Sequence, residues 1–396
     1  MNTHASLVLN GRHIQTGQPQ RITLNNKLIE QIETMPETDE VLPWIGPGLV
    51  DLQVNGYAGF DFNTPTLSSE DICNVALKIA RLGVTSFYPT IITNSDHTLE
   101  KLLGAISQAC TEHPWLHRIL RGIHLEGPYI SPENGVRGAH DKQFVKAPDW
   151  EQFQRWQTAA RGMIQIVTLS PEWENAPAFI AECVRHNIVI SIGHTAATPD
   201  QINRAVAAGA RMCTHLGNGA HLLLPRHPNY IWEQLAQDDL WPCVIADGFH
   251  LPEQVLKVFH KVKPNQLMLI SDAVSLSGLA PGTYSSFIGG NVVLTAEGRL
   301  HMADNPNLLA GSAQMLPFGV AHLVSSNLCE LAEAWDMAST RPASFMKLPE
   351  ARGLQVGAPG DLVVFDWLQE QFVIREVYKD GQQLTSSNGS TLDSQS

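Results

Sequence analysis

Four residues able to bind a metal ion or carry a proton stand directly after short apolar runs. They are Glu126 in Ile-His-Leu-Glu-Gly-Pro, His194 in Ile-Ser-Ile-Gly-His-Thr, His215 in Cys-Thr-His-Leu, and Asp272 in Leu-Met-Leu-Ile-Ser-Asp-Ala. An apolar run that ends in such a residue and a turn is typical of a barrel strand whose C-terminal tip carries chemistry. The pattern therefore predicts a metal-dependent hydrolase.

Glu126, His194 and His215 together have the composition of a catalytic metal site. Zinc-type ions bind neutral imidazole and carboxylate, and a site with three protein ligands leaves one position open for water. One carboxylate cancels only one unit of the ion's charge, so the pKa of a water at the ion stays at roughly 7. We therefore expect hydroxide to be available at neutral pH.

Two further residues have the chemistry to handle the proton and the oxyanion of an amide hydrolysis. Asp272 is the candidate acid/base, because a carboxylate beside the metal can take a proton from water and pass it to the leaving amine. His250, in Ala-Asp-Gly-Phe-His, can donate a hydrogen bond to the developing oxyanion. Taken singly, each of these residues could equally cap a turn or pack in the core, and we expect Asp247 to be structural. The hypothesis rests on their combination.

The segments that must position these residues alternate between strand and helix about eight times over residues 48–273. The expected strands are 48–55, 86–92, 119–126, 164–170, 188–194, 211–216, 243–247 and 267–272. Helical periodicity predicts helices at 68–82, 96–111, 175–186, 199–208 and 252–262. Eight strand-helix units make a (β/α)8 barrel, so we expect an α/β fold with a TIM-like barrel.

Both ends of the chain show short alternating strands instead. We expect residues 1–46 and 353–385 to form a small β-sandwich domain, and residues 47–352 to form the barrel domain. The strand-like pattern of residues 284–302 predicts a β excursion, a short β segment inserted after the eighth strand. Residues 386–396, rich in Ser, Gly and Asn, are expected to form a disordered tail.

Composition limits the class of partner. The 396 residues are 43% hydrophobic and 16% charged, and no window reaches the ~18 consecutive apolar residues of a membrane span. A formal charge of −13 opposes binding to nucleic acid or to an anionic membrane. The start has no basic segment followed by an apolar stretch, and the six cysteines form no Cys-x-x-Cys pair. We therefore expect a cytoplasmic protein with reduced cysteines.

Six motifs follow one another along the chain. They are His-Leu-Glu-Gly-Pro (124–128), Gly-His-Thr (193–195), Thr-His-Leu (214–216), Ala-Asp-Gly-Phe-His (246–250), Ser-Asp-Ala (271–273) and Leu-Ala-Gly-Ser (309–312). In this order the chain resembles the N-acetylglucosamine-6-phosphate deacetylases of the amidohydrolase superfamily over nearly its whole length. The resemblance implies removal of acetyl from an N-acetylated amino-sugar 6-phosphate, first of all N-acetylglucosamine 6-phosphate, giving acetate and the free amine.

The resemblance also implies a role for each candidate. Glu126, His194 and His215 would hold the metal, Asp272 would be the acid/base and His250 would contact the substrate carbonyl. A further histidine, His140 in Arg-Gly-Ala-His, would contact the sugar or its phosphate.

The phosphate itself would be held by Asn218, the backbone amide of Gly219 and Arg226. In the resembling proteins this arginine reaches across from a neighbouring subunit, which implies a homodimer. An arginine suits the task because its planar fork donates two charge-assisted hydrogen bonds.

The number of metal ions depends on the end of the first strand. Many amidohydrolases carry His-x-His there and hold a second ion, whereas this chain has Gln53-Val54-Asn55. Amides are poorer ligands than imidazole for zinc-type ions, so we expect one divalent ion per chain. Zinc is the first expectation, and iron, manganese or cobalt could use the same ligands.

The loop after His215 departs from the family pattern. Asn218 and Arg226 keep their places, but Gly219 replaces alanine and two histidines, His221 and His227, are added. These histidines could supplement the phosphate site, accept another epimer, or pack. N-acetylgalactosamine 6-phosphate and an unphosphorylated N-acetyl sugar therefore stay open as substrates. A deaminase or cyclic amidase, or a sugar-phosphate binder without catalysis, is a more distant alternative.

Overall fold

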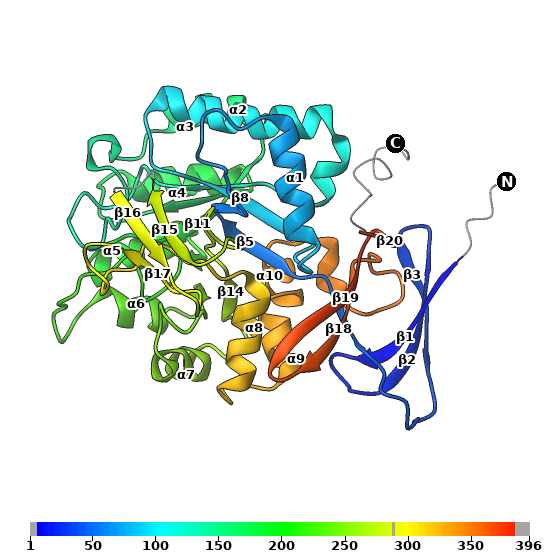
Figure 1. The fold of residues 1–396 in the computed structure, drawn as a ribbon. Coiled ribbons are helices and arrows are strands. Elements are labelled where there is room, and N and C mark those ends of the chain that lie inside the picture. The colour runs from blue at the N-terminus through cyan, green and yellow to red at the C-terminus, as the bar shows by residue number, and fades with distance from the viewer. Residues whose placement is uncertain (1–5, 287–289, 385–396) are drawn as a thin grey trace.

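An eight-stranded parallel sheet, wrapped into a nearly closed barrel, forms the centre of the computed structural model, which describes residues 6–286 and 290–384 (Figure 1). Each strand pairs with the next one along the chain. The strands are β5 (Val50–Val54), β8 (Ser86–Ile92), β9 (Ile123–Glu126), β10 (Ile164–Leu169), β11 (Val189–Ile192), β12 (Met212–Cys213), β13 (Trp241–Ile245) and β14 (Met268–Ile270). Val54 pairs with Ala273, just beyond β14, and so brings the two edges of the sheet together. The predicted TIM-like barrel is confirmed.

Helices connect the strands and cover the barrel (Figure 1). They are α1 (Ser69–Ala80), α2 (Asp96–Glu112), α3 (Trp150–Ala159), α4 (Ala176–Arg185), α5 (Pro199–Ala208), α6 (Tyr230–Ala236), α7 (Glu253–Val262), α8 (Leu316–Ser325), α9 (Leu331–Met337) and α10 (Thr340–Phe345). The five helices predicted from periodicity are present. Capping boxes fix the starts of two of them, because the side chains of Ser68 and Thr198 accept the backbone N–H three residues on.

The third barrel strand is shorter than predicted. Its apolar run was expected to be extended from residue 119, but Pro114 begins a 3-10 helix, η1 (Pro114–Arg118), and β9 starts only at Ile123. Proline suits the first turn of a helix because its missing N–H has no partner there. The apolar residues Leu116 and Ile119 are buried without belonging to a strand.

Strands from both ends of the chain meet in one seven-stranded mixed sheet, as predicted, in the order β20-β19-β18-β4-β1-β2-β3. They are β1 (Leu7–His13), β2 (Pro19–Asn25), β3 (Leu28–Thr34), β4 (Trp44–Pro47), β18 (Leu362–Leu368), β19 (Gln371–Lys379) and β20 (Gln382–Gln383). This terminal sheet lies beside the barrel (Figure 1). Trp335 of α9 joins the two parts, since its ring stacks on Phe365 and its Nε1 donates to the carbonyl of Pro47 at 2.9 Å.

The predicted β excursion is confirmed as an antiparallel sheet of β15 (Gly282–Ser286), β16 (Gly290–Leu294) and β17 (Leu300–Met302). A short hairpin of β6 (Gly56–Tyr57) and β7 (Phe60–Asp61) follows β5, and two further 3-10 helices are η2 (Lys142–Phe144) and η3 (Pro349–Arg352). The expected disordered tail lies outside the described residues.

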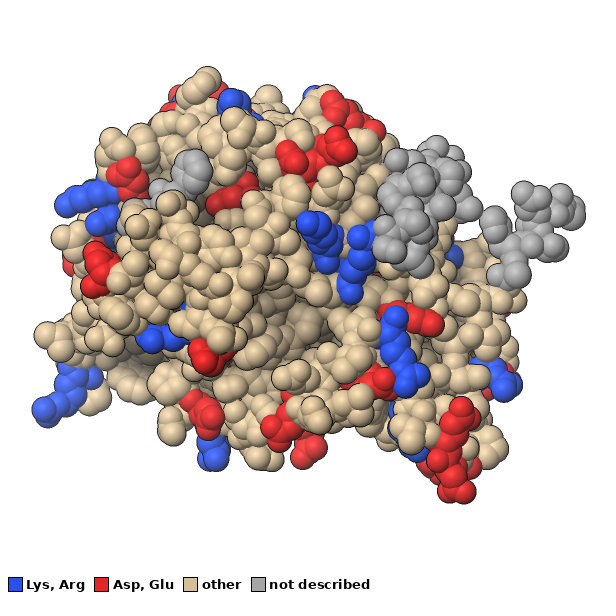
Figure 2. Space-filling view, viewed as in Figure 1, with Lys and Arg blue, Asp and Glu red and all other residues tan. Residues whose placement is uncertain are grey.

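The distribution of charge on the surface and the hydropathy of the described helices both agree with the composition of the sequence. Figure 2 shows Lys and Arg side chains interspersed with Asp and Glu over the face in view. No helix in the described ranges is long and apolar enough to cross a membrane.

Candidate active site

Three strands of the barrel, β9, β11 and β12, bring Glu126, His194 and His215 to the same end of the barrel. Glu126 is the last residue of β9, and each histidine lies two residues beyond β11 or β12. Both histidines have left-handed backbone, with φ of 47° and 29°. This conformation costs a non-glycine residue about 1–3 kcal/mol and occurs most often where a functional side chain must be aimed.

The ligand atoms of these three residues converge on one point. Glu126 Oε1 lies 3.2 Å from His194 Nε2 and 3.0 Å from His215 Nε2, and the two nitrogens are 3.0 Å apart. Tetrahedral donors at about 2.0–2.2 Å from one zinc-type ion lie about 3.3–3.6 Å from one another, and the three observed separations are within a few tenths of an ångström of this range. The separations and the donor types therefore fit a single divalent cation.

The electrostatics of this cluster also favour a cation. Burial raises the pKa of Glu126, but the hydrogen bonds and charges of His194 and His215 outweigh it and hold this pKa well below its usual range. In the described part of the chain the ion-pair partners of Glu126 are these two histidines, with no lysine or arginine among them. A buried carboxylate is costly without a cation, and a metal ion supplies one.

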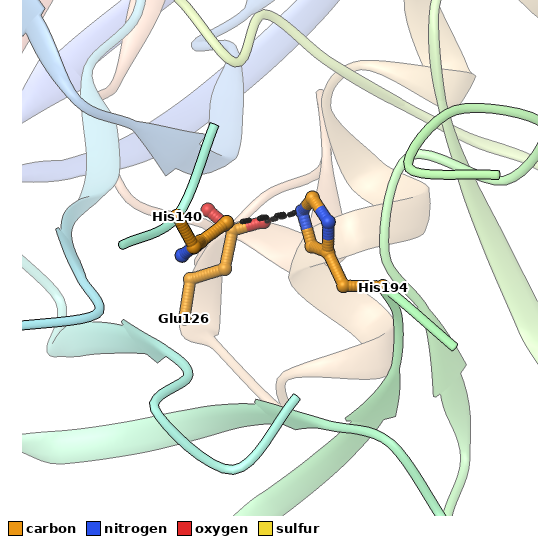
Figure 3. A group of neighbouring side chains, drawn as sticks. All are labelled: Glu126, His140 and His194. Atoms are coloured by element: carbon orange, nitrogen blue, oxygen red, sulfur yellow. Dashed lines mark hydrogen bonds and ion pairs between the residues drawn. The ribbon is translucent and has the colours of Figure 1, made fainter. Parts of the chain in front are cut away.

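His140 lies in the same cluster, and Figure 3 shows its side chain beside those of Glu126 and His194. The ligand atoms of these three buried residues lie within 4.8 Å of one another, and His140 Nε2 is 3.3 Å from His194 Nε2. Thr93 Oγ1 holds the other ring nitrogen of His140 at 2.8 Å. Burial, followed by the charge of His194, lowers the pKa of His140 to about 3, so its ring is neutral.

Asp272 lies two residues beyond β14, again with positive φ, at 48°. Its Oδ1 accepts hydrogen bonds from Gln53 Nε2 at 3.0 Å and Asn55 Nδ2 at 2.7 Å. Burial and then the charge of Glu126 raise the pKa of Asp272 to about 6, while the bond from Asn55 opposes this rise. The side-chain amides of Gln53 and Asn55, at the end of β5, therefore hold the carboxylate of Asp272 by hydrogen bonds.

His250 is held by Asp247 in the loop after β13. His250 Nδ1 lies 2.7 Å from Asp247 Oδ2, and Asp247 Oδ1 accepts the backbone N–H groups of Phe249 and His250. Burial opposes the charge of Asp247, but the bonds to His250 dominate and lower the pKa of Asp247 below its usual value. The histidine can thus present Nε2 to a ligand, and Asp247 orients it.

The residues expected to hold a phosphate differ in their surroundings. Gly219 packs on the metal-site rings, and a Cβ there would lie 2.8 Å from His194 Nδ1. The side-chain Nδ2 of Asn218 is buried and has no hydrogen-bond partner among residues 6–286 and 290–384. Arg226 and His227 are exposed, whereas His221 contacts Glu133 at 3.3 Å and Tyr230 at 3.2 Å. His221 therefore packs between the loop that carries Glu133 and the first residue of α6, Tyr230.

Two residues that support the cluster were missed from the sequence. Thr93 binds His140, and the carbonyl of Val136 accepts the Nδ1–H of His194 at 2.8 Å. Gly127 is a signal for the first, because a Cβ there would lie 2.2 Å from Thr93 Oγ1. A backbone carbonyl such as that of Val136 leaves no mark on the side-chain pattern.

Comparisons with known proteins cover both the barrel and the terminal sheet. The family model described as the amidohydrolase family matches residues 44–384. The N-acetylglucosamine-6-phosphate deacetylase of Danio rerio is 33% identical over 358 residues, which are 86% of this chain and 84% of that protein. The protein of the same name from Bacillus subtilis is 32% identical over 80% of this chain and 79% of its own length. The crystal structure of N-acetyl-D-glucosamine-6-phosphate deacetylase from Mycobacterium smegmatis has a TM-score of 0.83 at 25% identity, covering 96% of this chain and 100% of that chain.

Proposed function

The chain belongs to the N-acetylglucosamine-6-phosphate deacetylase family within the amidohydrolases, and from this premise we propose that it hydrolyses the acetamido group of N-acetylglucosamine 6-phosphate. The products are acetate and the amino-sugar phosphate. One observation supports this function above all. The buried ligand atoms of Glu126, His194 and His215 lie 3.0–3.2 Å from one another, and among the described residues no lysine or arginine pairs with Glu126.

Glu126, His194 and His215 are the proposed ligands of one divalent ion. When bound, such an ion acidifies water and polarises a carbonyl. Zinc is the proposed ion, because imidazole and carboxylate suit it, although iron, manganese or cobalt fit the same donors. One ion per chain is supported by Gln53 and Asn55, whose amide groups are both directed to Asp272.

Asp272 is the proposed acid/base. It accepts a proton as water forms a bond to the acetyl carbon, and it delivers that proton to the nitrogen when the carbon–nitrogen bond breaks. A carboxylate must be ionised to start this cycle and protonated to finish it. The raised pKa of Asp272, about 6, suits both steps near neutral pH.

His250 is the proposed partner of the carbonyl oxygen. A histidine whose Nδ1–H is bound by a carboxylate must be protonated at both nitrogens to donate through Nε2. In that form Nδ1 donates to the Asp247 carboxylate at 2.7 Å. His250 then donates to the oxygen as negative charge develops there.

The phosphate is assigned to Asn218, the amide of Gly219 and Arg226. The unpartnered Nδ2 of Asn218 supports a polar ligand at this point. Arg226 is exposed and follows in sequence two leucines that are 100% and 91% exposed, Leu222 and Leu223. Adjacent apolar side chains of this exposure favour burial against a second subunit, so the proposed protein is a homodimer in which Arg226 serves the partner's site.

Acetate release from three substrates tests the function. N-acetylglucosamine 6-phosphate should give the highest kcat/KM, above N-acetylgalactosamine 6-phosphate and unphosphorylated N-acetylglucosamine. Arg226→Ala should lower kcat/KM for the phosphorylated sugars by about 10–150-fold, the value of a hydrogen bond to a charged group. Equal rates with and without phosphate would remove the phosphate role of Arg226, and no acetate from any sugar would contradict the deacetylase function.

Sedimentation and elemental analysis test the remaining assignments. We expect a dimer that becomes monomeric when Leu222 and Leu223 are changed to serine, and one ion per chain. A monomeric wild-type protein or two ions per chain would contradict these assignments. A cytoplasmic location is also proposed, which suits the six cysteines, all free in the structure.

A further inference from the structure

We propose that His221 is a positioning residue that fastens the phosphate end of the site to the metal end. It joins the 217–229 segment, between β12 and α6, to the 131–140 segment, between β9 and η2. The 217–229 segment carries Asn218 and Gly219, which are assigned to the phosphate. This inference rests on the proposed function, and it gives His221 a role that needs no contact with the substrate.

His221 makes three polar contacts, which together use its backbone and both of its ring nitrogens. The Tyr230 hydroxyl accepts the backbone N–H of His221 at 2.8 Å and lies 3.2 Å from Nδ1. Glu133 Oε2 lies 3.3 Å from Nε2. Because an ionised carboxylate only accepts, Nε2–H donates to Glu133 and the hydroxyl of Tyr230 donates to Nδ1. The ring therefore ties the first residue of α6 to the 131–140 segment.

Two glycines allow the segments to approach each other and the ring of His194. The ring of His221 lies against Gly135, where a Cβ would be 3.3 Å from His221 Cδ2. Gly219 faces His194, and a Cβ there would be 2.8 Å from His194 Nδ1. Both glycines have positive φ, 95° and 56°, which favours glycine because it has no side chain. The two segments therefore meet beside a residue assigned to the metal.

The 131–140 segment is anchored to His194 without the help of His221. Ser131 donates its backbone N–H to the His194 carbonyl at 2.9 Å. The Val136 carbonyl accepts the Nδ1–H of the same histidine at 2.8 Å. Loss of the His221 contacts should therefore leave this segment, and with it the metal end of the site, in place.

The 217–229 segment depends on His221 to a greater degree. Among the described residues, the hydrogen bonds and ion pairs made by residues 219–228 are those of His221 and one from Asn229 Nδ2 to the Pro225 carbonyl at 3.0 Å. The latter bond lies within the segment and does not connect it to the rest of the site. Loss of the His221 contacts should therefore loosen this segment.

Tyr230 places the anchor of His221 beside the residues assigned to the phosphate. It is buried, and it lines one small cavity together with Asn218, Gly219 and His194. The buried Nδ2 of Asn218 has no hydrogen-bond partner in the described part of the chain. The position of this amide therefore depends on the backbone that His221 holds.

The kinetics of acetate release from two sugars separate positioning from a purely structural role. His221→Phe keeps a ring against Gly135 but removes both ring nitrogens. It should raise KM for N-acetylglucosamine 6-phosphate by about 5–30-fold, since loss of one hydrogen bond changes an equilibrium by roughly 2- to 10-fold. The kcat for this sugar and both constants for unphosphorylated N-acetylglucosamine should stay unchanged. An unchanged KM, or an equal loss on both sugars, would overturn the inference.

The partners of His221 provide a second set of variants. Tyr230→Phe and Glu133→Ala should each raise the same KM, and neither should raise it further when combined with His221→Phe; a further rise would contradict the proposed contacts. Glu133→Gln keeps an acceptor oxygen and should behave like the wild type. His260→Phe is the matched control, because His260 pairs with Glu333 at 2.7 Å on other helices, and it should change neither KM. If His221→Phe fails to fold, the partner variants decide.

Hydrogen exchange of the full-length protein without substrate tests the contact independently of catalysis. In His221→Phe, the amides of residues 217–224 should exchange faster than in the wild type, and those of residues 131–140 should not change. Unchanged exchange at 217–224 would overturn the role of His221 even in a protein that releases acetate. Faster exchange in a protein that releases no acetate from any sugar would contradict the deacetylase function and leave the contact standing.

Discussion

The two ends of the barrel both bury charge, but they balance it differently. Near the terminal sheet, Lys379 at the end of β19 is 1% exposed and donates to Asp361 at 2.5 Å, with Glu350 at 3.4 Å. At the strand tips, the buried carboxylates of Glu126 and Asp247 have only histidines as ion-pair partners among the described residues. The end near the terminal sheet therefore pairs its carboxylates with a lysine, whereas the described residues at the strand tips offer them only histidines.

This difference separates structure from function. Arg121 lies 3.8 Å from Glu350, so two cations face two carboxylates in the terminal-sheet cluster, which is close to neutral without any ligand. The strand tips reach neutrality only when protons or a metal ion are added. Because an unpaired buried charge is costly, a cluster that the chain leaves unbalanced indicates a bound ion.

The sharpest test of the comparison removes one negative charge from each end. Asp272→Asn should lower kcat by about 10²–10⁴-fold, because the proton carrier is lost, while elemental analysis should still find the ion. Asp361→Asn is the matched change at the other end, and it should leave the turnover of the folded protein unchanged. Near-normal acetate release by Asp272→Asn would remove Asp272 from the mechanism.

Removing the cation of the terminal-sheet cluster should affect stability instead. Lys379→Met leaves Asp361 and Glu350 buried without their main partner, and loss of one member of a buried ion pair costs about 3–5 kcal/mol. Urea denaturation should show this loss in the free energy of unfolding, with kcat unaltered at low denaturant. A change in kcat without a change in stability would mean that the two ends are coupled.

A third change tests the histidine at the rim of the site. Asp247→Asn keeps an oxygen for the N–H groups of Phe249 and His250 but removes the negative charge that faces His250 Nδ1. We expect kcat/KM to fall by about 10–100-fold, as for other residues that orient a functional histidine. The ion content should not change. If ion content fell with activity, Asp247 would belong to the metal site instead.

The barrel and the close approach of the residues at its strand tips could be predicted because both follow from local patterns. Eight apolar runs, each ended by a turn, specify parallel strands, and parallel strands place their ends together. Glu126, His194 and His215 therefore came within 3.2 Å of one another, as their shared position at strand ends implied. The 3-10 helix at Pro114 was missed because a short apolar run fits a strand or a helix equally well.

The supports of the site could not be predicted in the same way. His140 lies in an irregular loop, and its contact with Thr93 joins residues 47 positions apart. Neither periodicity nor spacing reports such a contact. Asp247 is different, because it bonds to a histidine only three residues on, and that spacing was a usable signal.

The smallest expected effect concerns the amide that faces Asp272. Asn55 Nδ2 donates to Asp272 Oδ1 at 2.7 Å and favours the carboxylate, while burial raises the pKa of this group to about 6. Activity requires the ionised form, so kcat/KM should fall as the pH drops through this pKa, or through a lower value when a cation is bound. Asn55→Ala removes a bond worth about 1.5–3 kcal/mol to a charged group, so the acidic limb should move up by about one pH unit or more. The basic limb is the internal control and should stay in place; an acidic limb that does not move would show that a group other than Asp272 controls it.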